Sequence, residues 1–73
     1  MIKVSRKFIE AVKLAGRPAY RIAWEAGLHP VLLSKIISGY ERIRPNDERV
    51  IAVGKVLGLP PRECFAIEEE PGG

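Results

Sequence analysis

Four glycines divide this chain into short segments and constrain its fold more than any other feature. They are Gly16, Gly27, Gly39 and Gly58. Each follows a stretch in which apolar residues recur at helical spacing, and glycine readily takes the left-handed conformation that ends many helices. The chain has only 73 residues, 47% of them hydrophobic, which suits a single domain near the lower size limit for folding alone. The pattern therefore predicts one all-helical (all-α) domain.

The apolar spacing predicts five helices. Phe8 and Val12 share one face of the first, and Ser5 is placed to cap its first turn. The third begins at Pro30, a residue that suits the first turn of a helix because its missing amide donor would be unpaired there. The expected helices cover residues 5–15, 18–26, 30–38, 47–57 and 61–65, with Asn46 or Asp47 as the cap of the fourth.

Positive charge gathers in the first part of the chain. The net charge at pH 7 is +3 overall, but residues 1–44 carry +6 and the remainder carries −3. Within the basic part, residues 40–46 are expected to form an exposed loop that holds Arg42 and Arg44, with Ile43 as its apolar anchor. Such an excess suits a phosphate backbone, although many proteins that bind no polyanion carry as much. Residues 68–73 predict an acidic, flexible tail that follows a domain at 1–67.

Several classes of protein find no support in the sequence. The single cysteine, Cys64, cannot form an intramolecular disulfide, and no cluster of Cys and His has metal-ligand spacing. No run approaches the roughly 20 apolar residues of a membrane span, and the first residues lack the apolar run of a signal peptide. No catalytic arrangement or phosphate-binding glycine loop is evident. We therefore expect a soluble cytoplasmic protein that is not an enzyme and needs no cofactor and no metal.

Residues 22–39 carry the most specific pattern in the chain. Ala23 allows two helices to approach closely, and Gly27 makes the turn between them. The pattern resembles the helix-turn-helix of the phage repressor and Cro-like family, also described as the xenobiotic response element type. The matching residues are Ile22, Ala23, Ala26, Gly27, Leu28, Leu33, Ser34, Ile36 and Gly39. The resemblance extends over about residues 6–65 and implies a compact five-helix bundle of the lambda repressor-like type. His29 stands where the family usually has a capping Ser or Thr.

The resemblance implies a DNA-binding transcriptional regulator with helix 30–38 in the major groove. On this view Lys35 would donate to a guanine, Ser34 would reach a base or a phosphate, and the apolar residues would touch a thymine methyl. The base-contacting set is Pro30, Val31, Ser34 and Lys35. The phosphate-contacting set, from the start of the second helix and the loop after the third, is Arg17, Ala19, Tyr20, Tyr40, Arg42 and Arg44. The family commonly binds double-stranded DNA as two-fold homodimers, so a homodimer is expected.

Two residues suggest a second interpretation, in which the helix-turn-helix binds protein. Leu32 lies at the edge of the outer face of helix 30–38, and Trp24 occupies a position that is usually exposed in the family. Trp24 is either a dimer or partner contact, or it packs against a loop of its own chain. The alternative function is a protein-interaction module, antitoxin-like or a phage accessory protein, with weak or no DNA binding. Salt dependence separates the two functions, because phosphate binding weakens steeply as salt rises and apolar docking changes little.

Overall fold

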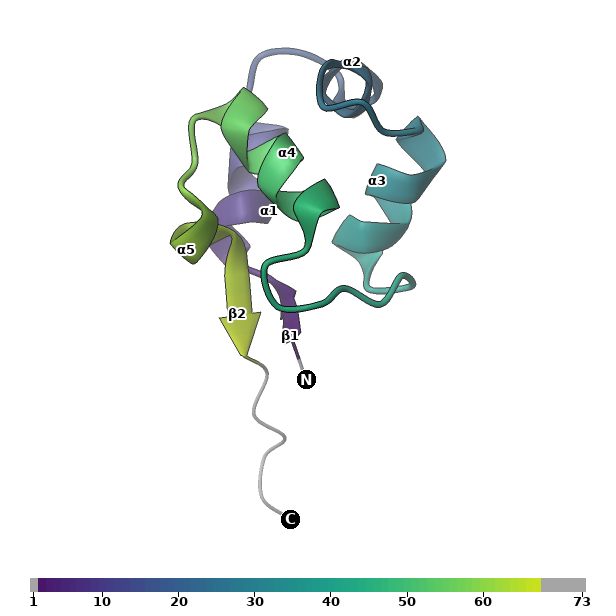
Figure 1. Ribbon diagram of the computed structural model, residues 1–73. Helices are drawn as coiled ribbons and strands as arrows, with labels where there is room; N and C mark the ends of the chain where they lie inside the picture. The colour runs from purple at the N-terminus through teal and green to yellow at the C-terminus, as the bar shows by residue number, and fades with distance from the viewer. Residues whose placement is uncertain (1, 68–73) are drawn as a thin grey trace.

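In the computed structural model, which describes residues 2–67, five helices surround one core and a short sheet pairs segments near the two ends of the chain (Figure 1). The elements are β1 (Ile2–Val4), α1 (Arg6–Lys13), α2 (Ala19–Glu25), α3 (Pro30–Ser38), α4 (Glu48–Leu57), α5 (Pro61–Cys64) and β2 (Phe65–Ile67). The acidic tail predicted at 68–73 lies outside the described residues.

The sheet corrects the all-α fold class. β1 and β2 pair antiparallel, with Ile2 opposite Ile67, and the ladder continues where the Ser5 amide donates to the Cys64 carbonyl at 2.9 Å. The helix predicted at 61–65 therefore ends at Cys64, and half-buried Phe65 begins β2. Strands of three residues are too short to carry a readable alternation of apolar and polar side chains. The sheet thus depends on a pairing between distant segments that local spacing does not reveal.

The helix ends follow the predicted caps closely. The Ser5 hydroxyl accepts a hydrogen bond from the Phe8 amide at 3.1 Å, as expected for the cap of α1. That helix ends at Lys13, two residues before the predicted end, and Pro18 is the N-cap of α2 rather than a residue of its first turn. Asp47 caps α4 by accepting from the Arg49 amide at 3.1 Å. The helical interpretation is confirmed, with small shifts at the ends.

The core draws on β1 and on every described helix. Its buried members are Val4, Phe8, Val12, Ile22, Ala23, Leu33, Ile36, Val50, Val53 and Cys64. α4 passes so close to α5 that a Cβ added at Gly54 would lie 2.5 Å from the Cys64 sulfur and 3.0 Å from the Leu59 carbonyl oxygen. Burial raises the pKa of the Cys64 thiol, and the neighbouring Glu63 carboxylate adds to this effect. Cys64, which is fully buried, therefore serves as a small core residue.

Candidate nucleic-acid interface

A tight turn sets the angle between α2 and α3. Gly27 has a φ of +79°, a backbone conformation that residues with a side chain rarely adopt. The chain then folds back so that the Leu28 amide donates to the Ala23 carbonyl at 2.8 Å. Ala23 itself is fully buried, which lets the two helices approach closely. The turn therefore holds α3 in a fixed orientation at the surface of the domain.

His29 caps the start of α3 in place of a hydroxyl residue. Its Nδ1 atom accepts a hydrogen bond from the Val31 amide at 3.1 Å. The imidazole nitrogen thus satisfies one of the amides that a helix leaves free at its first turn. α3 runs over Pro30–Ser38, as predicted, and Gly39 closes it in the left-handed conformation. The departure from the family pattern at this position leaves the helix intact.

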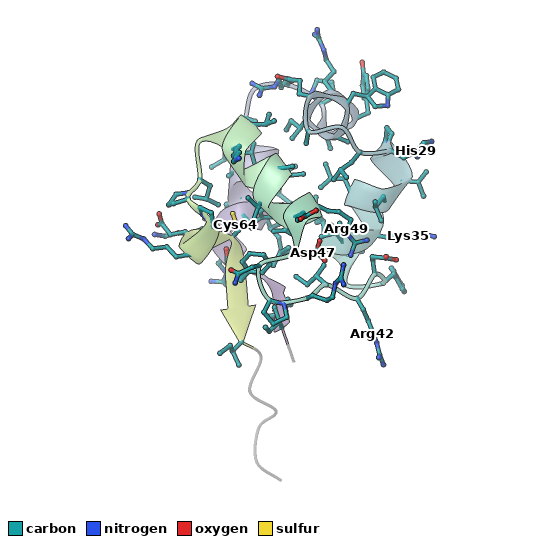
Figure 2. All side chains as sticks on the ribbon, in the orientation of Figure 1. His29, Lys35, Arg42, Asp47, Arg49 and Cys64 are labelled. Atoms are coloured by element: carbon teal, nitrogen blue, oxygen red, sulfur yellow. The ribbon has the colours of Figure 1, made fainter. Side chains whose placement is uncertain are left out.

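α3 has a clear division between an inner and an outer face. Leu33 and Ile36 are buried in the core, whereas Val31 is 54% exposed. Ser34 and Lys35 are also exposed, and Figure 2 shows Lys35 pointing away from the body of the protein. Three of the four predicted base-contacting residues are therefore exposed along one helix. The fourth, Pro30, is half-buried at the helix start.

Leu32 is placed differently from the sequence-based expectation. It is half-buried and packs against the hydrophobic core, so it is a poor candidate for a partner contact.

The residues predicted to bind phosphate at the start of α2 fall into two groups. Ala19 and Tyr20 are exposed at the first turn of the helix. Arg17 is half-buried, and its Nε atom donates to the Glu25 carboxylate at 2.8 Å. This ion pair joins the segment before α2 to the last residue of the helix. Arg17 therefore already has a counter-charge within the protein.

The loop between α3 and α4 presents the other predicted phosphate-binding residues outward. Tyr40 is 86% exposed, and Arg42 and Arg44 are exposed as well. Ile43, between the two arginines, packs against the core, as expected for the apolar anchor. Arg42 extends away from the loop on the same side of the molecule as Lys35 (Figure 2). The outer face of α3 and the loop that follows it along the chain thus carry three exposed cations, Lys35, Arg42 and Arg44.

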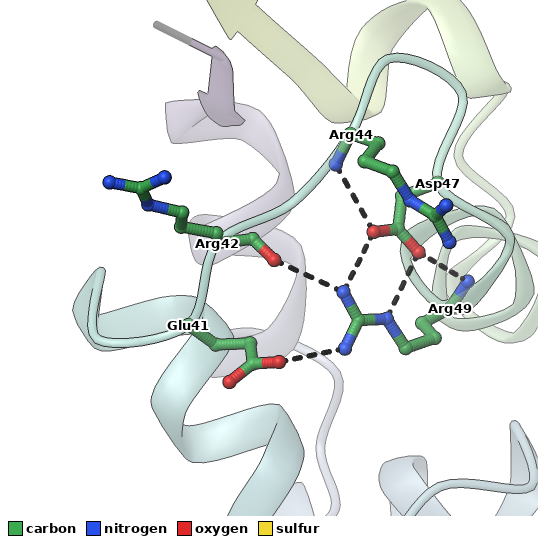
Figure 3. Close-up of polar contacts among 5 residues, drawn as sticks. All are labelled: Glu41, Arg42, Arg44, Asp47 and Arg49. Atoms are coloured by element: carbon green, nitrogen blue, oxygen red, sulfur yellow. Dashed lines mark hydrogen bonds and ion pairs between the residues drawn. The ribbon is translucent and has the colours of Figure 1, made fainter.

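A network centred on Arg49 holds this loop, and sequence reasoning missed it. The guanidinium binds both carboxylate oxygens of Asp47, at 3.0 and 2.8 Å, and also the Glu41 carboxylate at 3.0 Å and the Arg42 carbonyl at 3.1 Å (Figure 3). Asp47 in turn accepts from the Arg44 amide at 3.2 Å. The sequence gives only a weak signal for this network, namely that Glu41 and Asp47 lie within eight residues of Arg49. Acidic and basic residues at such spacing also occur on exposed helix surfaces.

Asp47 is the one buried charged residue among those that the structure describes, with 4% of its surface exposed. Hydrogen bonds from the Arg49 side chain lower its pKa from 3.8 to about 2, although burial acts in the opposite direction. Asp47 and Glu41 raise the pKa of Arg49 in return. Asp47 and Arg49 therefore both stay charged at neutral pH.

Trp24 is 64% exposed and makes its ring contact within its own helix. Its indole meets the Tyr20 ring edge-to-face, with centroids 5.7 Å apart and an interplanar angle of 81°. Packing against a loop of its own chain, one of the two alternatives from the sequence, is therefore not what the structure has. A contact between Trp24 and a partner stays a prediction.

Searches for other kinds of site gave negative findings. Within residues 2–67, no group of three or more His, Cys, Asp or Glu side chains could hold a metal ion. Over the same residues, no helix combines the length and the apolar character that crossing a membrane requires. Comparison of the chain with protein-family models, with curated proteins and with solved structures finds no match.

Proposed function

We propose that the protein is a DNA-binding transcriptional regulator of the phage repressor and Cro-like type, with α2 and α3 as its helix-turn-helix. One observation carries this proposal: the exposed face of α3 lies beside a loop that presents exposed arginines. An exposed helix alone is common in proteins. A helix that enters the major groove also needs cations beside it, because phosphates line both edges of the groove.

The outer face of α3 is assigned to base edges in the major groove. Lys35 donates to guanine O6 or N7, and Ser34 reaches a base or a neighbouring phosphate. Val31 and Pro30 are apolar and contact thymine methyl groups. With only one long polar side chain on this face, sequence preference depends strongly on Lys35.

Phosphate contacts come from both sides of α3. Tyr40, Arg42 and Arg44 bind one strand from the loop, while Tyr20 and the amide of Ala19 bind from the start of α2. Arg17 contributes less, because Glu25 already neutralises it. These contacts fix the orientation of the domain without reading sequence.

We further propose that the protein binds double-stranded DNA as a two-fold homodimer. One domain of this size makes few contacts, and two copies on half-sites about 34 Å apart engage successive major grooves on the same side of the duplex. A palindromic binding site follows from this symmetry.

The test is fluorescence-polarisation binding to randomised duplex DNA across a salt series, followed by sequencing of the bound fraction. We expect tight binding that weakens steeply with salt, and an enriched palindrome. Lys55→Ala is the matched control, because Lys55 is exposed in the last turn of α4, at the opposite end of that helix from the loop. Equal losses for Lys55→Ala and Lys35→Ala would contradict the assignment of the interface to α3.

A protein-interaction module is the second candidate, and the exposure of Val31 and Trp24 is the observation that favours it. Absence of DNA binding at low salt would overturn the first proposal in favour of this one. Pull-down with Val31→Ser and Trp24→Ala variants would then test whether these side chains form the docking surface.

A further inference from the structure

We propose that Arg49 is a positioning residue that fixes the DNA-binding loop relative to α3 without touching DNA itself. This inference rests on the proposed function, because it explains how that function's phosphate contacts are held in place. It concerns the segment from Tyr40 to Asp47, which connects α3 to α4.

The Arg49 guanidinium is turned inward and is nearly saturated. Four donations leave its side chain: two to Asp47, one to Glu41 and one to the Arg42 carbonyl. A guanidinium has five N–H groups, so little capacity remains for a phosphate. Its charge is balanced by two carboxylates, at 2.8 Å from Asp47 and 3.0 Å from Glu41. Arg49 is therefore a structural cation of the loop.

The loop is bound to α3 at one end and to α4 at the other. At its start, the amides of Tyr40 and Glu41 donate to the Lys35 carbonyl at 2.9 and 3.2 Å. At its end, the Arg44 amide donates to the Asp47 carboxylate at 3.2 Å. Arg49 joins these two ends, because it holds Glu41 and Asp47 at once. Arg49 therefore links the two ends of the loop, in addition to the backbone hydrogen bonds to α3 and the packing of Ile43 against the core.

Arg49 holds the loop in place, whereas Arg42 and Arg44 are left to bind DNA. The carbonyl of Arg42 points into the network while its guanidinium points away from it (Figure 3). Among residues 2–67, no ion pair engages the side chains of Arg42 or Arg44, so both are free to bind phosphate. Arg49 also neutralises Glu41 and Asp47, whose charges would otherwise repel phosphates close to the groove.

The first experiment compares Arg49→Lys with the wild-type chain in DNA binding. Lysine keeps the charge but loses the planar fork that holds two carboxylates and a carbonyl together. We expect affinity for the selected site to fall about 10-fold and the salt slope to shrink by roughly one to two phosphate contacts. In a background of Arg42→Ala and Arg44→Ala, the same substitution should change affinity less than about twofold, because both arginines are gone and Tyr40 is held by its own amide hydrogen bond to the Lys35 carbonyl.

A second variant tests the sign of the effect. Glu41→Gln removes a negative charge near the proposed interface, so a purely electrostatic view predicts stronger DNA binding. Positioning predicts the opposite, because the ion pair between Arg49 and the start of the loop is lost. We expect affinity to fall about threefold despite the gain in net positive charge. Stronger binding by Glu41→Gln would overturn the positioning role.

A third measurement needs no DNA. Hydrogen exchange of the free protein should be faster at the Arg44 amide in Arg49→Lys than in wild type, by about 10-fold. The Leu28 amide, which donates to Ala23 in the distant turn, is the internal control and should not change. Equal exchange at Arg44 in the two proteins would show that Arg49 does not hold the loop and would overturn the inference.

The remaining outcomes separate the two proposals. If wild type binds DNA and Arg49→Lys binds with unchanged affinity and salt slope, the positioning role fails while the proposed function stands. If Arg49→Lys loses as much affinity in the doubly substituted background as in wild type, Arg49 acts on DNA directly and the positioning role fails. If wild type does not bind DNA, the proposed function fails and the positioning role fails with it.

Discussion

Two regions of the molecule that flank α4 are held by opposite means. At the α5 side, the backbone of Gly54 lies so close to Cys64 that a single added carbon would meet the sulfur at 2.5 Å. At the α3 side, the chain between the helices is held by hydrogen bonds and ion pairs from Arg49. The first region is joined by close packing and the second by charge.

This difference bears on what each region is free to do. Gly54 and Cys64 are buried against each other, so a substitution at either residue acts through packing. The charged network uses the Arg42 carbonyl and the Arg44 amide, and it leaves the side chains of these two residues exposed. A substitution at the packed region should therefore change folding alone, whereas one at the charged region should change DNA binding as well as stability.

The largest effect is expected from Gly54→Ala. The new Cβ would overlap the Cys64 sulfur and press on the Leu59 carbonyl, and overpacking of this kind destabilises by about 3 kcal/mol. Urea denaturation followed by circular dichroism measures the loss. In the proposed assay, DNA affinity of the folded fraction should stay at the wild-type value.

A double-mutant cycle with Cys64→Ala sharpens this prediction. Removing the sulfur opens the space that the new methyl group needs, so the double variant should be more stable than the sum of the single losses predicts. The rescue is partial, because the Leu59 carbonyl would remain 3.0 Å from the added carbon. Additive losses would contradict the view that contact with Cys64 is what makes glycine necessary.

The next effect concerns pH and the charged region. Asp47 has a folded pKa of about 2 against an ordinary value of 3.8, so its contribution is fully present above pH 3.8 and is lost as pH falls toward 2. A shift of nearly two units corresponds to about 2 kcal/mol of stability. Denaturation midpoints between pH 5 and pH 2 should fall less steeply in Asp47→Asn than in wild type. Parallel pH profiles in the two proteins would show that the interaction between Asp47 and Arg49 does not stabilise the fold.

Much of the helical fold is legible in the sequence because local signals coincide. α3 was predicted to the residue, since Pro30 and Gly39 mark its two ends. The end of α1 was misplaced because Leu14 and Ala15 continue the apolar run, yet Leu14 is 82% exposed and only caps the helix. The sheet was missed altogether, because the pairing of Ile2 with Ile67 joins segments that no local pattern relates.

The candidate site was predictable as a set of exposed residues, but the contacts that hold it were not. The family resemblance placed Ser34 and Lys35 on the outer face of α3, and both are exposed. The role of Arg49 depends on how the chain turns before α4, where Asn46 adopts a left-handed conformation with φ of +56°. That turn brings Glu41 and Asp47 to the same guanidinium. Sequence spacing alone does not predict that these two carboxylates bind the same side chain.

A smaller effect should distinguish base contacts from phosphate contacts within the charged region. Lys35→Ala is expected to weaken binding to the selected DNA site by about 1.5 kcal/mol and to leave binding to random DNA nearly unchanged. Arg44→Ala should weaken binding to both kinds of DNA alike and reduce the salt slope by about one contact. Competition titrations with selected and random duplexes measure both. Equal losses on the two DNAs for Lys35→Ala would remove its base-reading role.

The smallest effect on stability is expected outside both regions, at Trp24. Because the indole is 64% exposed and contacts Tyr20 on the same helix, Trp24→Ala should lower the free energy of unfolding by only about 0.5 kcal/mol. Self-association is the sharper readout, since a large exposed indole is a typical anchor of an interface. We expect sedimentation velocity to find less dimer in Trp24→Ala than in wild type, whereas Leu14→Ala, which also shortens an exposed apolar side chain, should leave the dimer fraction unchanged. If both variants associate like wild type, the homodimer uses another surface, and Trp24 contacts neither the core nor a second copy.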